Sequence, residues 1–269
     1  MVTAPSLADR TVADLPTTVR SGPRYWLDAY LVTARWELAN LRLFLPVIVA
    51  VQVLAGVGLV LGFGIFTPGP LPPVSVLYVS TGVPVINLYL LGLVLLPQVV
   101  GQQRIADTYD FTRSLPVPRG VGLGAWLTVT LAAGIPAMAA TLLAAHLRYG
   151  FAPHPSAGLL PAVLLVALTA TAIGAVLAHV VSQPMVTMML TQVLNFVAIG
   201  FSPVAFPAEQ LPGWLAAVNH VLPFESMAVV MRSALSDAPV EGVPRAYAVL
   251  SAWSAACVLL AVRALGRRG

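Results

Sequence analysis

The sequence predicts an all-α protein that crosses a membrane several times. The chain of 269 residues is 58% hydrophobic and only 9% charged, whereas soluble proteins carry about 25% charged residues. From Leu43 to Gln103 there is no Asp, Glu, Lys, Arg or His, and between Arg148 and Glu209 the only such residues are two histidines. A spanning helix needs about 20 apolar residues, so each tract has room for two spans.

The N-terminal part is expected to lie outside the membrane. Residues 1–22 are polar and contain two prolines, which favours a disordered cytoplasmic tail. Residues 23–42 carry leucines at helical spacing beside charged residues and aromatic rings, a pattern typical of an amphipathic interface helix. An extension of the first span is the alternative. The residues expected at the membrane surface are Arg24, Trp26, Arg35 and Trp36.

Six spans are predicted within residues 43–269, which form the transmembrane domain. They cover about 43–66, 74–100, 121–147, 158–181, 185–206 and 246–264. A turn rich in proline and glycine at 67–73 ends the first span, and Pro184 follows a very short connection between the fourth and fifth spans.

The arginines predict the orientation. Eleven of the 14 basic residues, all of which are Arg, fall in the N-terminal segment, in the loop after the second span or at the C-terminus. The other three, Arg148, Arg232 and Arg245, fall on the opposite side. Basic loops favour the cytoplasm, so both termini are expected there. These arginines flank apolar spans, which is the reason to expect a membrane partner and no nucleic acid.

Several kinds of chemistry are disfavoured. A standard phosphate-binding P-loop needs a lysine, and the chain has none, so no ATPase site of its own is expected. The single cysteine, Cys257, permits no internal disulfide and no cysteine-based metal cluster. His146 and His154 have no third ligand, so no metal site is predicted. No predicted span holds a carboxylate or Arg of the kind that ion-coupled carriers use.

Polar and methionine side chains in two spans predict a substrate pathway. Met-rich surfaces repack around varied ligands, but the same residues also suit adaptable packing and interhelical hydrogen bonds. The candidate pathway residues are Asn87 in the second span and Met188, Gln192, Asn195 and Phe196 in the fifth.

The loop 101–119 is predicted to be the cytoplasmic coupling element. It is the one substantial cytoplasmic loop joined to a span at each end, and it mixes apolar and charged residues, as a docking surface does. A solvated loop is the alternative. Its candidate coupling residues are Arg104, Ile105, Asp107, Thr108, Tyr109, Asp110, Phe111 and Arg113.

The segment 207–232 is predicted to form a re-entrant helical hairpin on the outer side, before the last span. Its prolines divide it into pieces that are too short to span a membrane. Glu225 and Arg232 are seven residues apart and would share a helical face, so an ion pair between them is expected either within one protomer or across two protomers. Glu209 and Asn219 are expected to be accessible from outside. The exit residues are Phe206, Pro207, Leu211, Pro212, Trp214, Pro223, Glu225 and Arg232.

Two motifs in these segments resemble the permease subunits of ABC exporters of the ABC-2 type. That family has a stretch after the second span that ends in S/T-L-P-V and a basic residue. It also has an F-P-x-x-x-L-P-x-W-L … L-P … E … R pattern before the last span. The first motif is matched by Ser114, Leu115, Pro116, Val117 and Arg119, and the second by the exit residues together with Leu215 and Leu222. The chain departs from the family at Gln103, where glutamate is usual, and at Asp107, where glycine is common.

The resemblance implies a bacterial plasma-membrane permease that works in efflux. Two protomers, identical or homologous, would surround the pathway, and separate nucleotide-binding subunits would hold ATP and Mg²⁺. The expected cargo is a hydrophobic drug, an antibiotic or a lipid, and export of a polysaccharide or other glycoconjugate is the alternative within the family. The rivals outside it are an ion-coupled carrier and a membrane-embedded enzyme or structural subunit.

Overall fold

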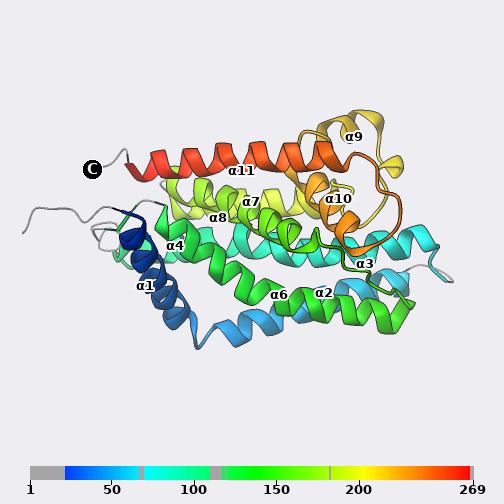
Figure 1. Ribbon diagram of the computed structural model, residues 1–269, viewed down its shortest axis with the longest axis horizontal. Helices are drawn as coiled ribbons and strands as arrows, with labels where there is room; N and C mark the ends of the chain where they lie inside the picture. The colour runs from blue at the N-terminus through cyan, green and yellow to red at the C-terminus, as the bar shows by residue number, and fades with distance from the viewer. Residues whose placement is uncertain (1–21, 67–69, 110–116, 119, 182, 267–269) are drawn as a thin grey trace, which may run out of the picture.

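A computed structural model describes residues 22–66, 70–109, 117–118, 120–181 and 183–266. The regular structure of these residues is entirely helical, which confirms the predicted fold class. Most of the helices run along the long axis of the molecule, and α1 (Pro23–Leu41) crosses them steeply at one end (Figure 1). The described chain begins and ends at this same end, called here the terminal end, and the opposite end holds the helices α9 and α10.

Within the described residues, five helical segments are long and apolar enough to cross a membrane. They are α2 (Leu45–Phe66), the segment Pro73–Ile105, α6 (Val121–Tyr149), α7 (Leu159–Val180) and α11 (Val243–Gly266). The segment Pro73–Ile105 consists of α3 (Pro73–Leu90), a π-helix η3 (Leu91–Leu95) and α4 (Leu96–Ile105). These segments make the chain a multi-pass membrane protein.

The predicted fifth span is shorter than expected. Its helix α8 covers Pro184–Gly200, 17 residues, and the chain then bends through 201–206. Pro203 lacks the amide hydrogen that a helix would need there, and its ring would clash with the preceding turn. Helices α9 (Gly213–Asn219) and α10 (Pro223–Leu235) pass the same test only as a pair bent by 75°, as a broken span or a re-entrant loop does.

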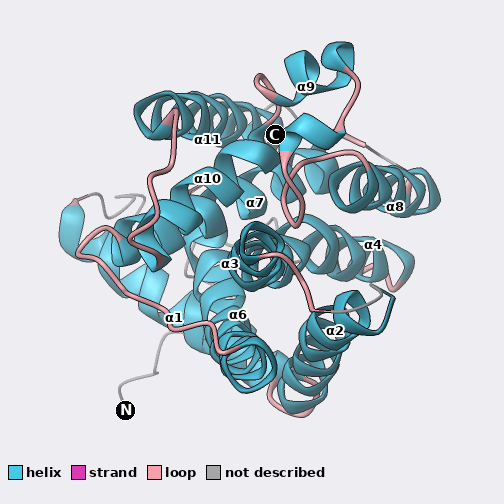
Figure 2. Cartoon of the chain, turned by 90° about the vertical axis from the view of Figure 1, so that its right-hand side faces the viewer, coloured by secondary structure: helices cyan, strands magenta, loops and turns pink. Residues whose placement is uncertain are grey.

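The span formed by α3, η3 and α4 lies at the centre of the bundle. Viewed end-on, α3 has the other helices around it (Figure 2). Its side chains form the main apolar core with those of α7 and α10, among them Tyr89, Val166 and Met231. The backbones of η3 and α7 meet closely, because a Cβ atom added to Gly174 would lie 2.1 Å from the carbonyl oxygen of Gly92.

Helix α2 is attached through apolar packing, in which the buried Val60 meets Val79, Val83 and Ala145, and through polar contacts. One face of this helix is exposed and apolar. On the other face, the Gln52 amide donates to the backbone oxygen of Asn87 at 3.0 Å, and the Asn87 amide donates to Thr141 Oγ1 at 2.8 Å. Gly56 lets the helices approach, since a Cβ atom there would meet both the Asn87 and the Thr141 side chains.

Helix α1 packs on α6 with the C-terminal part of the predicted apolar stripe, because Leu38 and Leu41 pack against the cluster that holds Trp126 and Val129 of α6. Tyr30 hydrogen-bonds Thr128 Oγ1 at 2.7 Å, and Ala34 is buried, whereas Leu27 is exposed. Glu37 shares the buried face and is only 8% exposed. Burial raises the pKa of its carboxyl to about 7. The four predicted surface residues, Arg24, Trp26, Arg35 and Trp36, are exposed.

Candidate functional site

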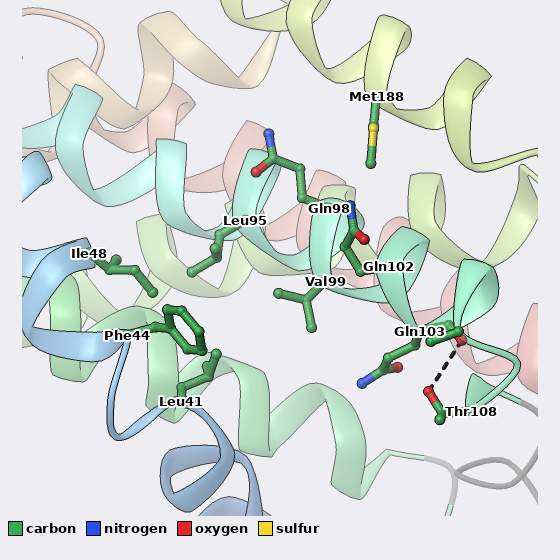
Figure 3. A pocket seen from close by; sticks show the side chains of 11 residues that line it. Leu41, Phe44, Ile48, Leu95, Gln98, Val99, Gln102, Gln103, Thr108 and Met188 are labelled. Atoms are coloured by element: carbon green, nitrogen blue, oxygen red, sulfur yellow. Dashed lines mark hydrogen bonds between the residues drawn. The ribbon is translucent and has the colours of Figure 1, made fainter.

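A pocket of about 570 Å³ opens between α2, α4 and α8 near the terminal end. This volume falls within the 300–1,000 Å³ range of ligand pockets. Figure 3 shows side chains from several elements around this pocket. Ile48 lies on α2 and Phe44 in the turn before it, and Met188 extends toward the pocket from α8. Gln98 and Gln102 project from α4. The full lining is Leu41, Phe44, Ile48, Leu95, Gln98, Val99, Gln102, Gln103, Ala106, Thr108 and Met188.

The chemistry of this lining is apolar with neutral hydrogen-bonding groups. Three glutamines and one threonine are its only polar side chains, and none of the lining residues is charged. A glutamine amide can both donate and accept hydrogen bonds, whereas a charged group placed in such surroundings would lose its hydration without a counter-ion. The pocket therefore suits a molecule with an apolar body and an uncharged polar group.

Helix α4 ends at the rim of this pocket in a left-handed turn. Asp107 has a φ of 54°, a conformation that costs little for glycine and more for other residues. The Thr108 amide donates to the Gln103 carbonyl at 2.9 Å, and the Asp107 amide donates to the Arg104 carbonyl at 3.4 Å. This is the Schellman arrangement, whose left-handed position is usually glycine. It gives a physical reason for the glycine that is common here in the ABC-2 type pattern.

Next to the turn, the loop is fastened to the end of α7. Arg104 donates to the carbonyl oxygens of Ala178 and Val181, the last of the helix. The Tyr109 hydroxyl lies 2.9 Å from Nδ1 of His179, and the two rings stack with centroids 6.0 Å apart. The Arg104 guanidinium also sits 4.6 Å from the centroid of the Tyr109 ring. We call Arg104, Tyr109 and His179 the clasp.

The described candidate coupling residues differ in exposure. Tyr109 is half-buried against its own chain, where it is part of the clasp. Ile105 is exposed and available to a partner. Asp107 and Thr108 are exposed as well, and Thr108 also borders the pocket. Asp110, Phe111 and Arg113 lie outside the described residues.

At the opposite end, the described residues show no ion pair between Glu225 and Arg232 within one protomer, and a pair across two protomers stays a prediction. Both residues lie on α10, but Glu225 contacts His220 at 3.1 Å and Arg245 at 3.7 Å. Arg232 turns to the other side, where it donates to the Val204 carbonyl oxygen at 3.0 Å and to Thr81 Oγ1 at 3.2 Å. Its guanidinium carbon lies 3.6 Å from the centroid of the Tyr78 ring. Glu225 and Arg232 therefore bind different partners, although both lie on α10.

Other exit residues divide between surface and interior. Trp214 and Pro212 are exposed, whereas Pro223 is buried; Phe206, Pro207 and Leu211 are half-buried. The expectation that Asn219 is accessible is wrong for this structure. Asn219 is 1% exposed, because its amide donates to the carbonyl oxygen of Phe201 at 2.8 Å and so holds α9 against the end of α8.

The predicted pathway residues do not gather in one place. Met188 lines the pocket, and Gln192 and Phe196 point away from the protomer, with Phe196 75% exposed. Asn195 is half-buried. Asn87 is fully buried at the junction of α2, α3 and α6, where it hydrogen-bonds Thr141.

Sequence reasoning missed most of the pocket. Gln98 and Gln102 are four residues apart, so they share a face of a helix, and they stand at the end of an otherwise apolar span. That spacing was the sequence pattern from which a polar pocket wall could have been predicted. The contributions of Phe44 and Ile48 depend on the angle at which the chain turns from α1 into α2, which no local pattern indicates.

Comparison with protein-family models finds one match: residues 108–263 match the model described as "ABC-2 family transporter protein". This range contains α6 to α10 and nearly all of α11. No curated protein matches the chain.

Proposed function

The chain belongs to the ABC-2 family of transporter proteins, and on that premise we propose that it is the permease subunit of an ATP-driven exporter. It moves a hydrophobic or amphiphilic compound outward across the bacterial cytoplasmic membrane. A separate ATPase subunit holds ATP and Mg²⁺ and supplies the energy, and a second permease protomer, identical or homologous, completes the pathway.

The observation that carries this proposal is the pocket of about 570 Å³ beside the loop that follows α4. Its uncharged lining suits a compound that enters from the membrane, and Thr108 belongs both to its rim and to the predicted coupling loop. A site that takes up cargo next to the point where the ATPase docks allows ATP-driven movement of the loop to change the shape of the pocket.

The proposal also assigns the two ends of the molecule. The terminal end, with α1 and the loop after α4, faces the cytoplasm, and the exposed Trp26 and Trp36 seat α1 at the inner membrane surface. The hairpin of α9 and α10 faces outward and covers the exit, with Trp214 exposed at its surface.

The test is reconstitution of the permease with its ATPase subunit. In inside-out vesicles we expect ATP-dependent uptake of a neutral amphiphilic dye, unaffected by proton ionophores. Met188→Trp, which fills the pocket, should abolish uptake. Met185→Trp is the matched control, because Met185 lies on the same helix with its side chain exposed. Uptake that persists without ATP and collapses with an ionophore would instead identify an ion-coupled carrier.

A further inference from the structure

We infer that the clasp makes α7 the element through which movement of the loop after α4 reaches the outer hairpin. This inference rests on the proposed function, in which an ATPase displaces that loop. The loop joins α4 to α6, so the chain itself connects it to those two helices only. The clasp adds a third connection, to α7, which is separated from Tyr109 by 70 residues of sequence.

The first support is that α7 is tied to the central span at two levels. At the terminal end, Arg104 binds the last carbonyl groups of α7, and Tyr109 binds His179. Deeper in the bundle, the backbones meet at Gly92 and Gly174, with no room for a side chain between them. Two separate ties prevent α7 from sliding independently of α4.

The second support is the irregular helix at the deeper tie. Gly92 lies in the π-helix η3, between the regular helices α3 and α4. Such π-helical turns are rare and frequently occur at functional sites. The contact between Gly92 and Gly174 is therefore a suitable pivot. Helix α4 and the C-terminal end of α7 can tilt together about this contact, while α3 stays fixed in the core.

The third support is what α7 contacts at its other end. Core side chains of α7 pack with those of α10, including Met227 and Met231. Thr169 on α7 also hydrogen-bonds Ser254 on α11 at 2.6 Å. Helix α10 is part of the outer hairpin, and α11 follows it directly, so a tilt of α7 is passed to the helices that cover the exit. Helix α6 packs mainly on α1, α2 and α3, and it also contacts α7, where Thr130 hydrogen-bonds Thr171 at 3.2 Å.

The clasp could instead be a simple cap on α7, because the last carbonyls of a helix need partners. The two roles differ in what they predict for the coupling between ATP hydrolysis and transport. A cap affects stability alone. A connecting element also determines how many cargo molecules move per ATP hydrolysed.

The experiment uses the complete transporter in vesicles, with ATP hydrolysis and dye uptake measured in the same preparation. Tyr109→Phe removes only the hydroxyl, and His179→Phe keeps a ring for stacking but removes the hydrogen-bonding nitrogen. Each should retain the ATPase subunit and its hydrolysis but lower uptake per ATP roughly two- to tenfold, as expected for loss of one hydrogen bond. The double variant should be no worse than either single one, because both remove the same contact.

Tyr30→Phe is the matched control. It deletes a tyrosine hydroxyl that bonds Thr128 across α1 and α6, so it costs a similar hydrogen bond without touching α7. We expect uptake per ATP to be unchanged. Equal ratios in wild type, Tyr109→Phe and His179→Phe would overturn the inference, and so would loss of the ATPase subunit from Tyr109→Phe. A wild-type chain that never retains an ATPase contradicts the proposed function instead.

A second measurement tests the same connection by joining the loop to α7 covalently. Cysteines at positions 109 and 179, in a background with Cys257→Ala, are joined by a short bifunctional reagent. If the loop and α7 move as one body, the joined transporter retains uptake per ATP. If the loop must separate from α7 during the cycle, the crosslink stops uptake while the unlinked cysteine variant works, and the inference fails.

Discussion

Replacement of the buried Arg232 by alanine should destabilise the protein strongly. Arg232 is 4% exposed and contacts the Val204 carbonyl, Thr81 Oγ1 and the Tyr78 ring. Alanine leaves two buried oxygens without their donor, at about 1–3 kcal/mol each, and removes a desolvated cation–π contact worth about 2 kcal/mol. Relief of the buried charge offsets part of this loss. We therefore expect the free energy of unfolding to fall by about 3–5 kcal/mol.

The chain contains its own reporter for this measurement. Cys257 is the only cysteine and is 6% exposed, so a thiol-reactive dye labels it when the structure opens. In domains of about 150–250 residues, a loss of 1 kcal/mol in the free energy of unfolding lowers the melting temperature by about 2–4 °C. Arg232→Ala should thus lower the labelling midpoint by roughly 6–20 °C, and Arg232→Lys, which keeps the charge but loses the planar fork, by less.

Arg245→Ala is the matched control. Its side chain is 52% exposed, and its contact with Glu225 spans 3.7 Å. Exposed pairs of this kind contribute about 0–1 kcal/mol, so the midpoint should move by no more than a few degrees. Equal shifts for Arg232→Ala and Arg245→Ala would refute the reasoning, because they would show that the buried contacts of Arg232 add nothing.

Three further predictions use the same labelling assay. Asp107→Gly should raise the free energy of unfolding by about 0.5–1 kcal/mol, because Asp107 is left-handed; Asp28→Gly, within α1, should lower it by a similar amount. An increase for both, or for neither, would contradict the role of the left-handed turn. Gly174→Ala should prevent normal assembly, since its Cβ would lie 2.1 Å from the Gly92 oxygen, whereas Gly62→Ala on α2 meets open space and should be tolerated. A normal midpoint for Gly174→Ala would show that the crossing is looser than described. Because burial raises the pKa of Glu37 to about 7, the folded state holds this proton more tightly than the unfolded state. The contribution of Glu37 to the free energy of unfolding is therefore greatest below about pH 4.5 and is lost as the pH rises through 7, a change on the order of 3 kcal/mol. Glu37→Gln should remove this dependence, and an unchanged pH profile would rule out Glu37 as its source.

The spans could be predicted from sequence because lipid imposes a simple rule: about 20 apolar residues in a row. That rule indicated α2, α6, α7 and α11 to within a few residues. It overestimated α8, because Val204, Ala205 and Phe206 are apolar but follow Pro203 and fill the bend instead of a helix. Hydrophobicity alone does not separate these two uses of an apolar residue.

The site was harder to predict because its contacts join distant parts of the chain. The loop after α4 was singled out by its polar composition, but its attachment to His179 depends on how α4 and α7 cross. The same holds for Glu225 and Arg232, where the shared helical face was correctly expected. Their partners, His220 and Val204, come from segments whose positions only the packed structure shows.

The polar attachment of α2 has a consequence for how the protein is made. Gln52 on α2 bonds the Asn87 backbone of the next span, and the Asn87 side chain bonds Thr141 on α6, a helix that is synthesised later. Until α6 is inserted, α2 and α3 must persist in lipid without this third helix, which the mean hydropathy of 2.4 for α2 and 2.0 for the segment Pro73–Ile105 permits. Docking then gains little from the hydrophobic effect, because lipid is as apolar as the protein. Mutation of Gln52 or Asn87 should therefore yield a chain that inserts normally and fails only at the later step of helix assembly.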